Sequence, residues 1–342
     1  MAVCCAGYPV LLRHSEIGLS RIAVNLLLKL ATIVWISFPK KRTVMQRPSI
    51  PRSIGITRRH LPAVLAACLL VTLTTASAAT LYVDAASTNA VPPFTSWATA
   101  AVTIQDAVDA AVAGDEIVVT NGVYQTGSRA VYGMSNRVAV TKPVTVRSVN
   151  GPTNTIIQGA GPVGENAIRC VYLTNGAVLA GFTLTNGATH AFNHFEKEGS
   201  GGGAWCETTA LLSNCVLTGN SAFSFGGGAY FGTLNYCTLT GNSATYGGGS
   251  QSAALNHCTL TGNSASDDGG GSYFGTLNHC TLSDNWASTY GGGSAAGALT
   301  NCTLIGNFAD YGGGSYGDRQ QLHIDWQFRD RCRGRRVRMQ HA

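Results

Sequence analysis

Residues 237–250 read CTLTGNSATYGGGS, and close copies of this phrase recur along the chain at intervals of 21 or 22 residues. Each copy carries a cysteine, a leucine three residues before it, an asparagine five residues after it and then a run of three glycines. A segment of this length cannot close a hydrophobic core alone, so neighbouring copies must stack and bury each other's apolar faces. The repeated positions are Cys215, Cys237, Cys258, Cys280 and Cys302 together with Asn220, Asn242, Asn263, Asn285 and Asn307.

Within one copy, the spacing of the apolar residues indicates a strand that follows a bend. Cys237 and Leu239 share one face of a strand, whereas Thr238 points to the other side. Leu234 stands at odd spacing from Cys237, so a bend must separate them if both face inward. The glycines from Gly247 suit a corner and disfavour a helix, and stacked asparagines are able to form amide ladders. A leucine-rich repeat would need a helical return segment. The pattern therefore predicts an all-β, right-handed parallel β-helix with one coil per repeat.

Two stretches carry a family resemblance. The phrase at 237–250 resembles the repeats of bacterial polymorphic outer membrane proteins, although it has GGGS or GGGA where those repeats usually have Gly-Gly-Ala-Ile. Residues 81–127, from LYVDAAS to GVYQTG, are similar to the entry segment of secreted right-handed β-helix proteins of the pectin-lyase-like superfamily. Together the two stretches imply the same fold over roughly residues 81–317. The resemblance also implies that lyases on this fold use calcium-binding acids and a basic residue that removes a sugar proton.

The beginning of the chain reads as an export signal. Residues 57–60 are TRRH, an apolar run follows from Leu61 to about Thr74, and Ala76-Ser77-Ala78 comes next. A basic start, a short apolar core and small residues before a cleavage point are typical of a secretory signal peptide, although a membrane anchor is the alternative. We expect residues 45–78 to be this signal, with translation starting at Met45. Residues 1–44 are then a mis-annotated or non-structural extension, unless their apolar part is a second anchor. The protein is accordingly expected to be secreted or displayed at the cell surface.

The mature part divides into three consecutive segments. Residues 79–127 are predicted to hold a first strand and a capping helix, whose apolar face repeats at helical spacing and stops at Gly114. Such a helix would cover the apolar end of the first coil. Residues 128–200 are predicted to form irregular coils, and residues 201–317 the regular array. The helix face is Ile104, Ala107, Val108, Ala111 and Val112; the predicted strands are 81–84, 116–120, 144–147, 155–157, 168–173 and 178–184.

After Gly317 the repeat gives way to an arginine-rich segment, residues 318–342. Reading the possible codons of residues 318–328 one nucleotide later permits TGNNCTLTGNS, which is the repeat phrase. The codons of Trp326 and Gln327 force a glycine in that frame. We expect residues 318–342 to be an unstructured basic tail produced by a single-nucleotide frameshift in the gene or in its sequencing.

The repeated cysteines occupy one position on the same face as leucine, so we expect buried free thiols that behave as small hydrophobic residues. Cα atoms on adjacent coils would also lie near the distance that a disulfide needs. Cys170 and Cys206, in less regular coils, are the other candidates for a disulfide.

Polar clusters in the array are few. His257 and His279 precede cysteines of consecutive coils, which indicates neighbouring surface imidazoles or, alternatively, a metal pair. Asp267 and Asp268 precede a glycine corner and are candidates for a calcium site, against the simpler interpretation of a solvated turn. No other cofactor is expected.

The charge distribution bears on function. The net charge is +6, yet residues 199–317 contain neither Lys nor Arg, so the array offers no basic surface for nucleic acid or an anionic membrane. A lyase base would have to come from earlier coils, and no acid pair with hydrolase spacing is evident; no catalytic residue is assigned. The candidates for such a base are Arg129, Arg137, Lys142, Arg147, Arg169 and Lys197.

Two functions remain open. The first is a secreted or surface-displayed β-helix with a structural or adhesive role, whose exposed Tyr, Phe, Thr and Asn rows contact other cell-surface components. The second is a carbohydrate-active enzyme, either a polysaccharide lyase or a glycoside hydrolase, or a carbohydrate-binding protein of the pectin-lyase-like group. The lack of basic residues on the array favours the first.

Overall fold

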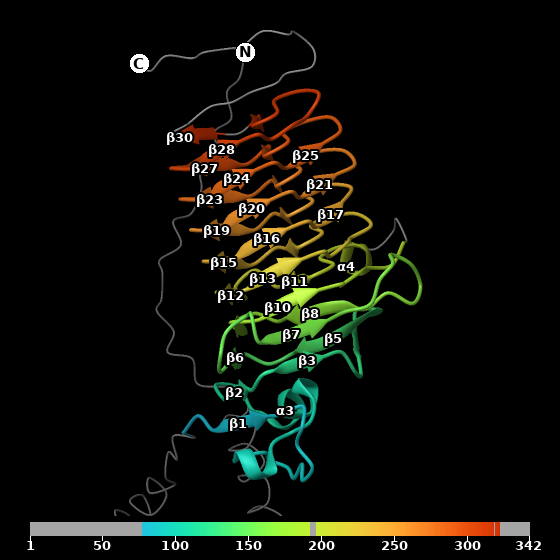
Figure 1. Cartoon of the computed structure of the whole chain (residues 1–342), viewed down its shortest axis with the longest axis vertical. Helices are drawn as coiled ribbons and strands as arrows, with labels where there is room; N and C mark the ends of the chain where they lie inside the picture. The colour runs from blue at the N-terminus through green and yellow to red at the C-terminus, as the bar shows by residue number, and fades with distance from the viewer. Residues whose placement is uncertain (1–76, 192–195, 318, 322–342) are drawn as a thin grey trace, which may run out of the picture. The chain divides into compact units, whose positions relative to one another are not determined.

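The computed structural model describes residues 77–191, 196–317 and 319–321. All described residues belong to one compact unit of the chain, Thr75–Ala342. In this unit short parallel strands stack coil upon coil, as Figure 1 shows from the blue first strand to the red last ones. The predicted right-handed parallel β-helix is confirmed.

Three long sheets form the walls of the coil and a fourth, smaller one lines a corner. The first sheet contains β1 (Thr80–Val83), β2 (Glu116–Val119), β6 (Thr145–Ser148), β9 (Val178–Ala180), β12 (Leu211–Ser213), β15 (Thr233–Asn235), β19 (Ala254–Asn256), β23 (Thr276–Asn278), β27 (Ala298–Thr300) and β30 (Arg319–Gln321). The second contains β3 (Gly122–Tyr124), β7 (Thr155–Gln158), β10 (Thr183–Thr185), β13 (Val216–Thr218), β16 (Thr238–Thr240), β20 (Thr259–Thr261), β24 (Thr281–Ser283) and β28 (Thr303–Ile305). The third contains β4 (Arg129–Val131), β5 (Met134–Val140), β8 (Arg169–Leu173), β11 (Ala204–Cys206), β14 (Ala229–Tyr230), β18 (Ser250–Gln251), β22 (Ser272–Tyr273), β26 (Ser294–Ala295) and β29 (Ser315–Tyr316). The corner sheet contains β17 (Ser243–Ala244), β21 (Ser264–Ala265) and β25 (Trp286–Ala287).

The repeat phrase explains the path of one coil. Leu234 in β15 and Leu239 in β16 both point into the core, and the chain bends between them at Tyr236, which has a φ of 55°. This left-handed conformation is uncommon for a residue with a side chain, and it supplies the bend that the odd leucine spacing predicted. Leu239 pairs in register with Leu260, and Leu260 with Leu282, so each leucine position forms a continuous buried column.

The asparagines that recur at regular spacing along the chain form a buried amide ladder. Asn263 lies fully buried; its Nδ2 donates to Oδ1 of Asn285 at 2.9 Å and to the carbonyl of Leu239 at 2.9 Å. Its own Oδ1 accepts from the backbone N and the Nδ2 of Asn242, at 3.1 and 3.0 Å. One side chain thus satisfies several polar groups that would otherwise be buried without partners.

Because of these bonds, replacing Asn263 by leucine is expected to lower the free energy of unfolding by about 3 kcal/mol or more, since each orphaned buried group costs about 1–3 kcal/mol. Asn256→Ala is the matched control, because Asn256 is half-buried and its Nδ2 makes a single bond, to Oδ1 of Asn235 at 2.9 Å. Chemical denaturation of the two variants measures the difference. If both variants lost the same free energy of unfolding, the buried asparagine ladder would not stabilise the fold more than a surface asparagine does.

A short helix, α3 (Ile104–Ala110), closes the first coil, as the sequence predicted. The hydroxyl of Thr103 accepts from the backbone N of Asp106 at 3.1 Å and caps its start, and Ile104, Ala107 and Val108 pack into the core. The helix ends earlier than expected, since Nζ of Lys142 binds the carbonyls of Val108, Asp109 and Ala111 at 3.1, 2.8 and 2.6 Å. Val112 was placed wrongly on the apolar face; it is 59% exposed. A three-residue 3₁₀ helix, η1 (Trp97–Thr99), precedes α3.

The irregular coils depart from the predicted strands in two places. The predicted strand at 178–184 is two strands, β9 and β10, because Gly181 adopts a φ of 79° and turns the chain between them. The sequence reading also missed β4 and β5, which form the one antiparallel pair among the described strands. A further short helix, α4 (Glu196–Gly199), precedes the regular array.

Several predictions fall on residues that the structure does not describe. The extension, the signal peptide up to residue 76 and most of the predicted tail lie outside the described residues. The signal peptide and the frameshift therefore remain predictions. Residues Arg319–Gln321 form β30, which pairs in parallel with β27. Within the described ranges no helix is long and apolar enough to cross a membrane.

Candidate functional site

A row of aromatic side chains runs along the outside of the third sheet and its glycine corner. Tyr172, Trp205 and Tyr230 pair in register on adjacent strands, so their rings lie one above another. Phe225 and Tyr246, just before two glycine corners, are also in register. We call this row the aromatic ladder; its members are Tyr132, Tyr172, Trp205, Phe225, Tyr230, Tyr246, Tyr273, Tyr290, Tyr311 and Tyr316.

Ring contacts connect the ladder over many coils. Tyr172 and Trp205 stack with centroids 5.5 Å apart and planes 15° apart. Phe225 and Tyr246 are 5.5 Å apart, and Tyr246 and Tyr273 are 5.3 Å apart. These distances lie in the favourable range for aromatic pairs. Stacked, tilted and edge contacts therefore link the rings from Tyr132 to Tyr273, and a second group links Tyr290 with Tyr311 and Tyr316.

Accessibility changes along the ladder. Trp205 and Tyr230 are almost completely buried, at 5% and 1% exposure, under Phe231 and other neighbouring rings. Tyr132 at the start and Tyr311 near the end are half exposed, at 50% and 51%. Tyr246 lies between these extremes. The rings of Trp205 and Tyr230 are therefore closed to a ligand, and the accessible rings include Tyr132 and those from Tyr246 onward.

Two polar atoms on this surface lack partners. Nε1 of Trp205 and Oε1 of Gln251 are buried and make no hydrogen bond to any described residue. Gln251 in β18 lies between Tyr230 and Tyr273 in the register of the third sheet. Buried polar groups without partners are rare in proteins and call for an explanation. Both atoms are closed to solvent, so in this arrangement of side chains they are not available to a ligand.

A carboxylate borders the lower part of the ladder. The hydroxyl of Tyr172 donates to Oε1 of Glu207 at 3.0 Å, and the Tyr132 hydroxyl lies 3.5 Å from the same oxygen. Burial, followed by this carboxylate, raises the pKa of Tyr172. Nζ of Lys197 sits 3.6 Å from the centre of the Tyr132 ring, a cation–π contact. These contacts join residues up to 75 positions apart, a combination that the repeat pattern does not reveal.

A second acidic group lies within the ladder. Asp268 takes the place between Tyr246 and Tyr290 that an aromatic residue holds in the coils on either side, and its Oδ1 accepts from the backbone N of Tyr290 at 3.1 Å. Burial and then Asp267 raise the pKa of Asp268. A hydrogen bond to Asp267 and burial raise the pKa of Tyr246 to about 12. The two aspartates, predicted as calcium candidates, therefore lie against tyrosines, and no group of three metal-binding side chains occurs in the described part of the chain.

The raised pKa of Asp268 predicts a pH dependence. The folded state holds the proton more tightly than the unfolded state, so its contribution to stability is complete at low pH and is lost as pH rises through the folded pKa. Asp268→Asn keeps the Oδ1 acceptor without the charge. We expect this variant to melt at a higher temperature than the wild type at pH 7, and the gap to shrink on acidification to pH 4. Asp310→Asn, at an exposed position, is the control, and a gap independent of pH would contradict the assignment.

The basic residues proposed as lyase bases all have structural partners. Arg129 pairs with Asp109, and Nε of Arg147 lies 2.5 Å from Oε1 of Glu116. Arg137 donates to the carbonyls of Gln158 and Gly127. Lys142 caps helix α3, as described above. None of these four side chains contacts the aromatic ladder through a described bond.

Arg169 is the most deeply buried of the six, at 1% exposure. It donates to Oδ1 of Asn136 at 2.9 Å and to the carbonyls of Lys197, Ser200 and Gly201 at 2.6 to 2.9 Å. Burial lowers its pKa to about 9. Because no face of the guanidinium reaches solvent, this arginine holds the loop before the array and is not available to a substrate.

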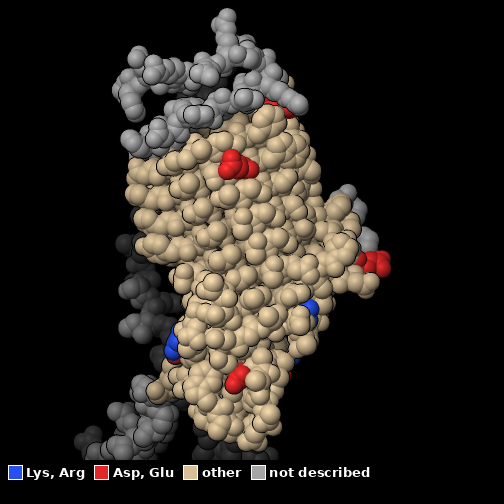
Figure 2. Space-filling view, in the orientation of Figure 1, with Lys and Arg blue, Asp and Glu red and all other residues tan. Residues whose placement is uncertain are grey.

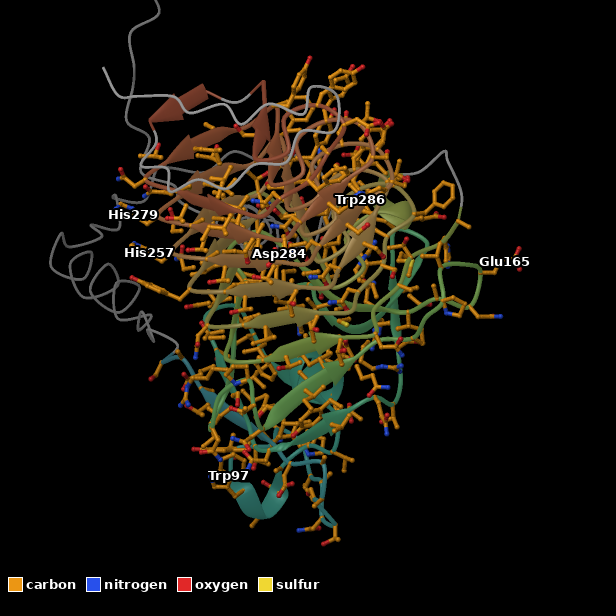
Figure 3. All side chains as sticks on the ribbon, turned by 45° about the horizontal axis from the view of Figure 1, so that its top comes forward. Trp97, Glu165, His257, His279, Asp284 and Trp286 are labelled. Atoms are coloured by element: carbon orange, nitrogen blue, oxygen red, sulfur yellow. The ribbon has the colours of Figure 1, made fainter. Side chains whose placement is uncertain are left out.

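The predicted histidine pair lies on the outer surface of the β-helix, whereas the cysteines lie in its core. His257 and His279 stack on the surface with ring centroids 4.9 Å apart, side by side on successive coils in Figure 3, and Tyr236 continues the stack at 5.1 Å. All seven described cysteines are free and buried, including Cys170 and Cys206. Burial raises the pKa of the Cys170 thiol to about 12. These thiols are core residues.

Comparisons with known proteins find distant structural similarity and no sequence match. No family model and no curated protein sequence matches this chain. Among solved structures, pectate lyase Pel9A is 14% identical with a TM-score of 0.49, over 72% of this chain and 68% of that one. Pectin methylesterase PemA from Erwinia chrysanthemi is 11% identical with a TM-score of 0.43, over 75% and 93%. A rhamnogalacturonan lyase is 14% identical with a TM-score of 0.36, over 72% and 67%. At these identities the similarity concerns the β-helix fold alone.

Proposed function

We propose that this β-helix is a non-catalytic, adhesive protein that binds a polysaccharide along its aromatic ladder. The observation that carries the proposal is the ladder itself, in which accessible aromatic rings and carboxylates share one surface. Aromatic faces stack on the apolar faces of sugar rings, while carboxylates and amides accept bonds from sugar hydroxyls. A rigid wall with one or two rings on each coil suits an extended polymer better than a small ligand.

The charges around the ladder favour an uncharged glycan. Residues 199–317 contain no Lys or Arg, whereas Glu207, Asp267, Asp268 and Asp310 accompany the ladder. A polyuronate would bring further negative charge to these carboxylates, which costs free energy. The basic side chain with a described contact to the ladder, Lys197, lies at its first ring, outside the array. We therefore propose neutral polysaccharides as the ligand class. The same argument counts against a lyase or hydrolase acting on acidic polysaccharide.

The test is a panel of soluble polysaccharides, neutral and acidic, run with the full chain. Affinity electrophoresis or calorimetry measures binding, and assays for new reducing ends and unsaturated ends measure cleavage. We expect retention by at least one neutral glycan, weak or no retention by polygalacturonate, and no cleavage. Cleavage would replace the proposal by the enzymatic alternative. Absence of binding to every neutral glycan would reject it.

An adhesive role requires export, which the sequence supports through the apolar run that precedes Ala78. We propose cleavage after Ala78 in an exporting host and display outside the cell. Mass spectrometry of the mature N-terminus is expected to find Ala79 as the first residue. An intact N-terminus in the membrane fraction would support the anchor instead.

A further inference from the structure

The second sheet carries an array of threonines on its outer face, away from the aromatic ladder. Each strand places two side chains outward with a buried leucine between them, as Thr259 and Thr261 do on either side of Leu260. We call the two outward columns the threonine face. One column is Thr183, Val216, Thr238, Thr259, Thr281 and Thr303, and the other is Thr185, Thr218, Thr240, Thr261, Ser283 and Ile305.

The register of the sheet makes this face a two-dimensional lattice. Thr238 pairs directly with Thr259, and Thr259 with Thr281, so no coil is displaced by a residue. Strands of a sheet lie about 4.8 Å apart, and alternate residues of one strand lie about 6.6 Å apart. In Figure 1 the strands from β13 to β28 lie side by side along the stack. The backbone therefore fixes hydroxyls and methyls at regular intervals in both directions.

The chemistry of the face is uniform. Nine of its twelve members are threonine, with a serine, a valine and an isoleucine in the other places. None is charged, and Figure 2 shows a surface of the array on which nearly every residue is uncharged. Neighbouring hydroxyls are close enough to bond, as for Thr261 and Ser283, whose oxygens are 3.0 Å apart. Methyl groups that restrict water, alternating with hydroxyls that bond it, suit an ordered layer of water.

We propose that the threonine face is an ice-binding site. Its two intervals are close to repeat distances between water oxygens on a prism face of hexagonal ice, so water held by the face would continue the crystal lattice. The half-burial of most of these side chains by their neighbours limits their rotation, and β-branching restricts it further. Water is then ordered before contact with ice, without the loss of side-chain entropy that flexible polar groups incur. This site is independent of the glycan site, which lies on another sheet.

The test uses the full chain and two matched threonine-to-lysine variants. Thr259 and Thr276 are both exposed, central in the array and outward on a three-residue strand, but Thr276 lies in β23 of the first sheet. We expect the wild type and Thr276→Lys to show thermal hysteresis and shaped ice crystals. We expect Thr259→Lys to lose both, because a long hydrated cation stands out of the lattice. Melting curves of both variants verify that the fold is kept.

Three results would overturn the proposal. The first is ice growth in the presence of the wild type at the same rate as with an equal concentration of an unrelated protein. The second is an equal loss of ice activity in both variants, which would show that the activity does not depend on the threonine face. The third is binding to crystalline cellulose that Thr259→Lys removes, in the absence of ice activity, which would assign the face to a solid polysaccharide.

Discussion

Replacing Leu260 by aspartate is expected to abolish the cooperative unfolding transition of the array, or to lower its midpoint by tens of degrees. Leu260 is fully buried in β20, between Leu239 and Leu282 of adjacent coils. A carboxylate at this position would have no cation and no route to water, since the described core residues around it are leucines, alanines and thiols. Burial of an unpaired charge costs several kcal/mol. The total free energy of unfolding of a domain is only about 5–15 kcal/mol.

The neighbouring residue supplies the control. Thr259→Asp puts the same charge one position earlier, on the exposed side of the same strand. We expect this substitution to change the free energy of unfolding by about 0.5 kcal/mol or less, as other surface substitutions do. Leu260→Ala, which leaves a cavity without a charge, should fall between the two, at about 2–5 kcal/mol. Circular dichroism melts of the three variants measure this order, and an unaltered melt for Leu260→Asp would mean that Leu260 does not face the core.

The fold of the regular array can be predicted because every repeat has the same pattern of inward and outward residues. Cys237 and Leu239 alternate with outward threonines, and a repeat of nearly constant length leaves one register that keeps these side chains inside. The strand boundaries before residue 201 are harder to predict, because no repeat fixes the register there. The strand predicted at 178–184 was a single apolar run in the sequence, and only the positive φ of Gly181 divides it. The hairpin of β4 and β5 pairs locally, outside the coil pattern.

The aromatic ladder could be predicted only in part. Rows of exposed tyrosine and phenylalanine were expected on the surface, but their positions were not assigned. The sequence did not show that a row that includes Tyr230 and Tyr273 lies beside the row of Phe225 and Tyr246 across each corner. It also did not show that Glu207 meets tyrosines of earlier coils. Such contacts depend on side-chain directions at a corner, which vary with local backbone angles and are not set by the period.

The cysteines illustrate how a repeat changes the usual reading of a residue type. An exported protein with many cysteines normally suggests disulfides. Here Cys237 and Cys258 stand just before the paired strands β16 and β20, and the backbone N of Cys237 donates to the sulfur of Cys258 at 3.4 Å. Stacked positions place identical side chains in parallel, so the sulfurs act as space-filling groups. The same geometry is what aligns the rings of the ladder.

Removing two rings from the ladder is expected to reduce affinity for a bound neutral polysaccharide by about 30-fold or more, or to abolish measurable retention. In Tyr246→Ala/Tyr273→Ala the rings lost are partly exposed, 5.3 Å apart and adjacent to Asp267 and Asp268. Each contact residue of this kind contributes about 1–2 kcal/mol to binding, and 1.4 kcal/mol is a factor of ten in the dissociation constant. Affinity electrophoresis with the best glycan of the panel measures the loss.

Two further variants locate the effect. Tyr236→Ala removes a ring that is 65% exposed and stacked on His257, but it lies at the bend between the first and second sheets, away from the ladder. It should bind like the wild type. Tyr246→Phe keeps the ring and removes the hydroxyl that bonds Asp267, so it should retain most of the affinity if stacking dominates. Equal weakening by Tyr236→Ala and the ladder variant, with both proteins folded, would show that aromatic surface in general adsorbs the glycan. In that case the third sheet would hold no defined site, and an adhesive role would have to rest on another face of the β-helix.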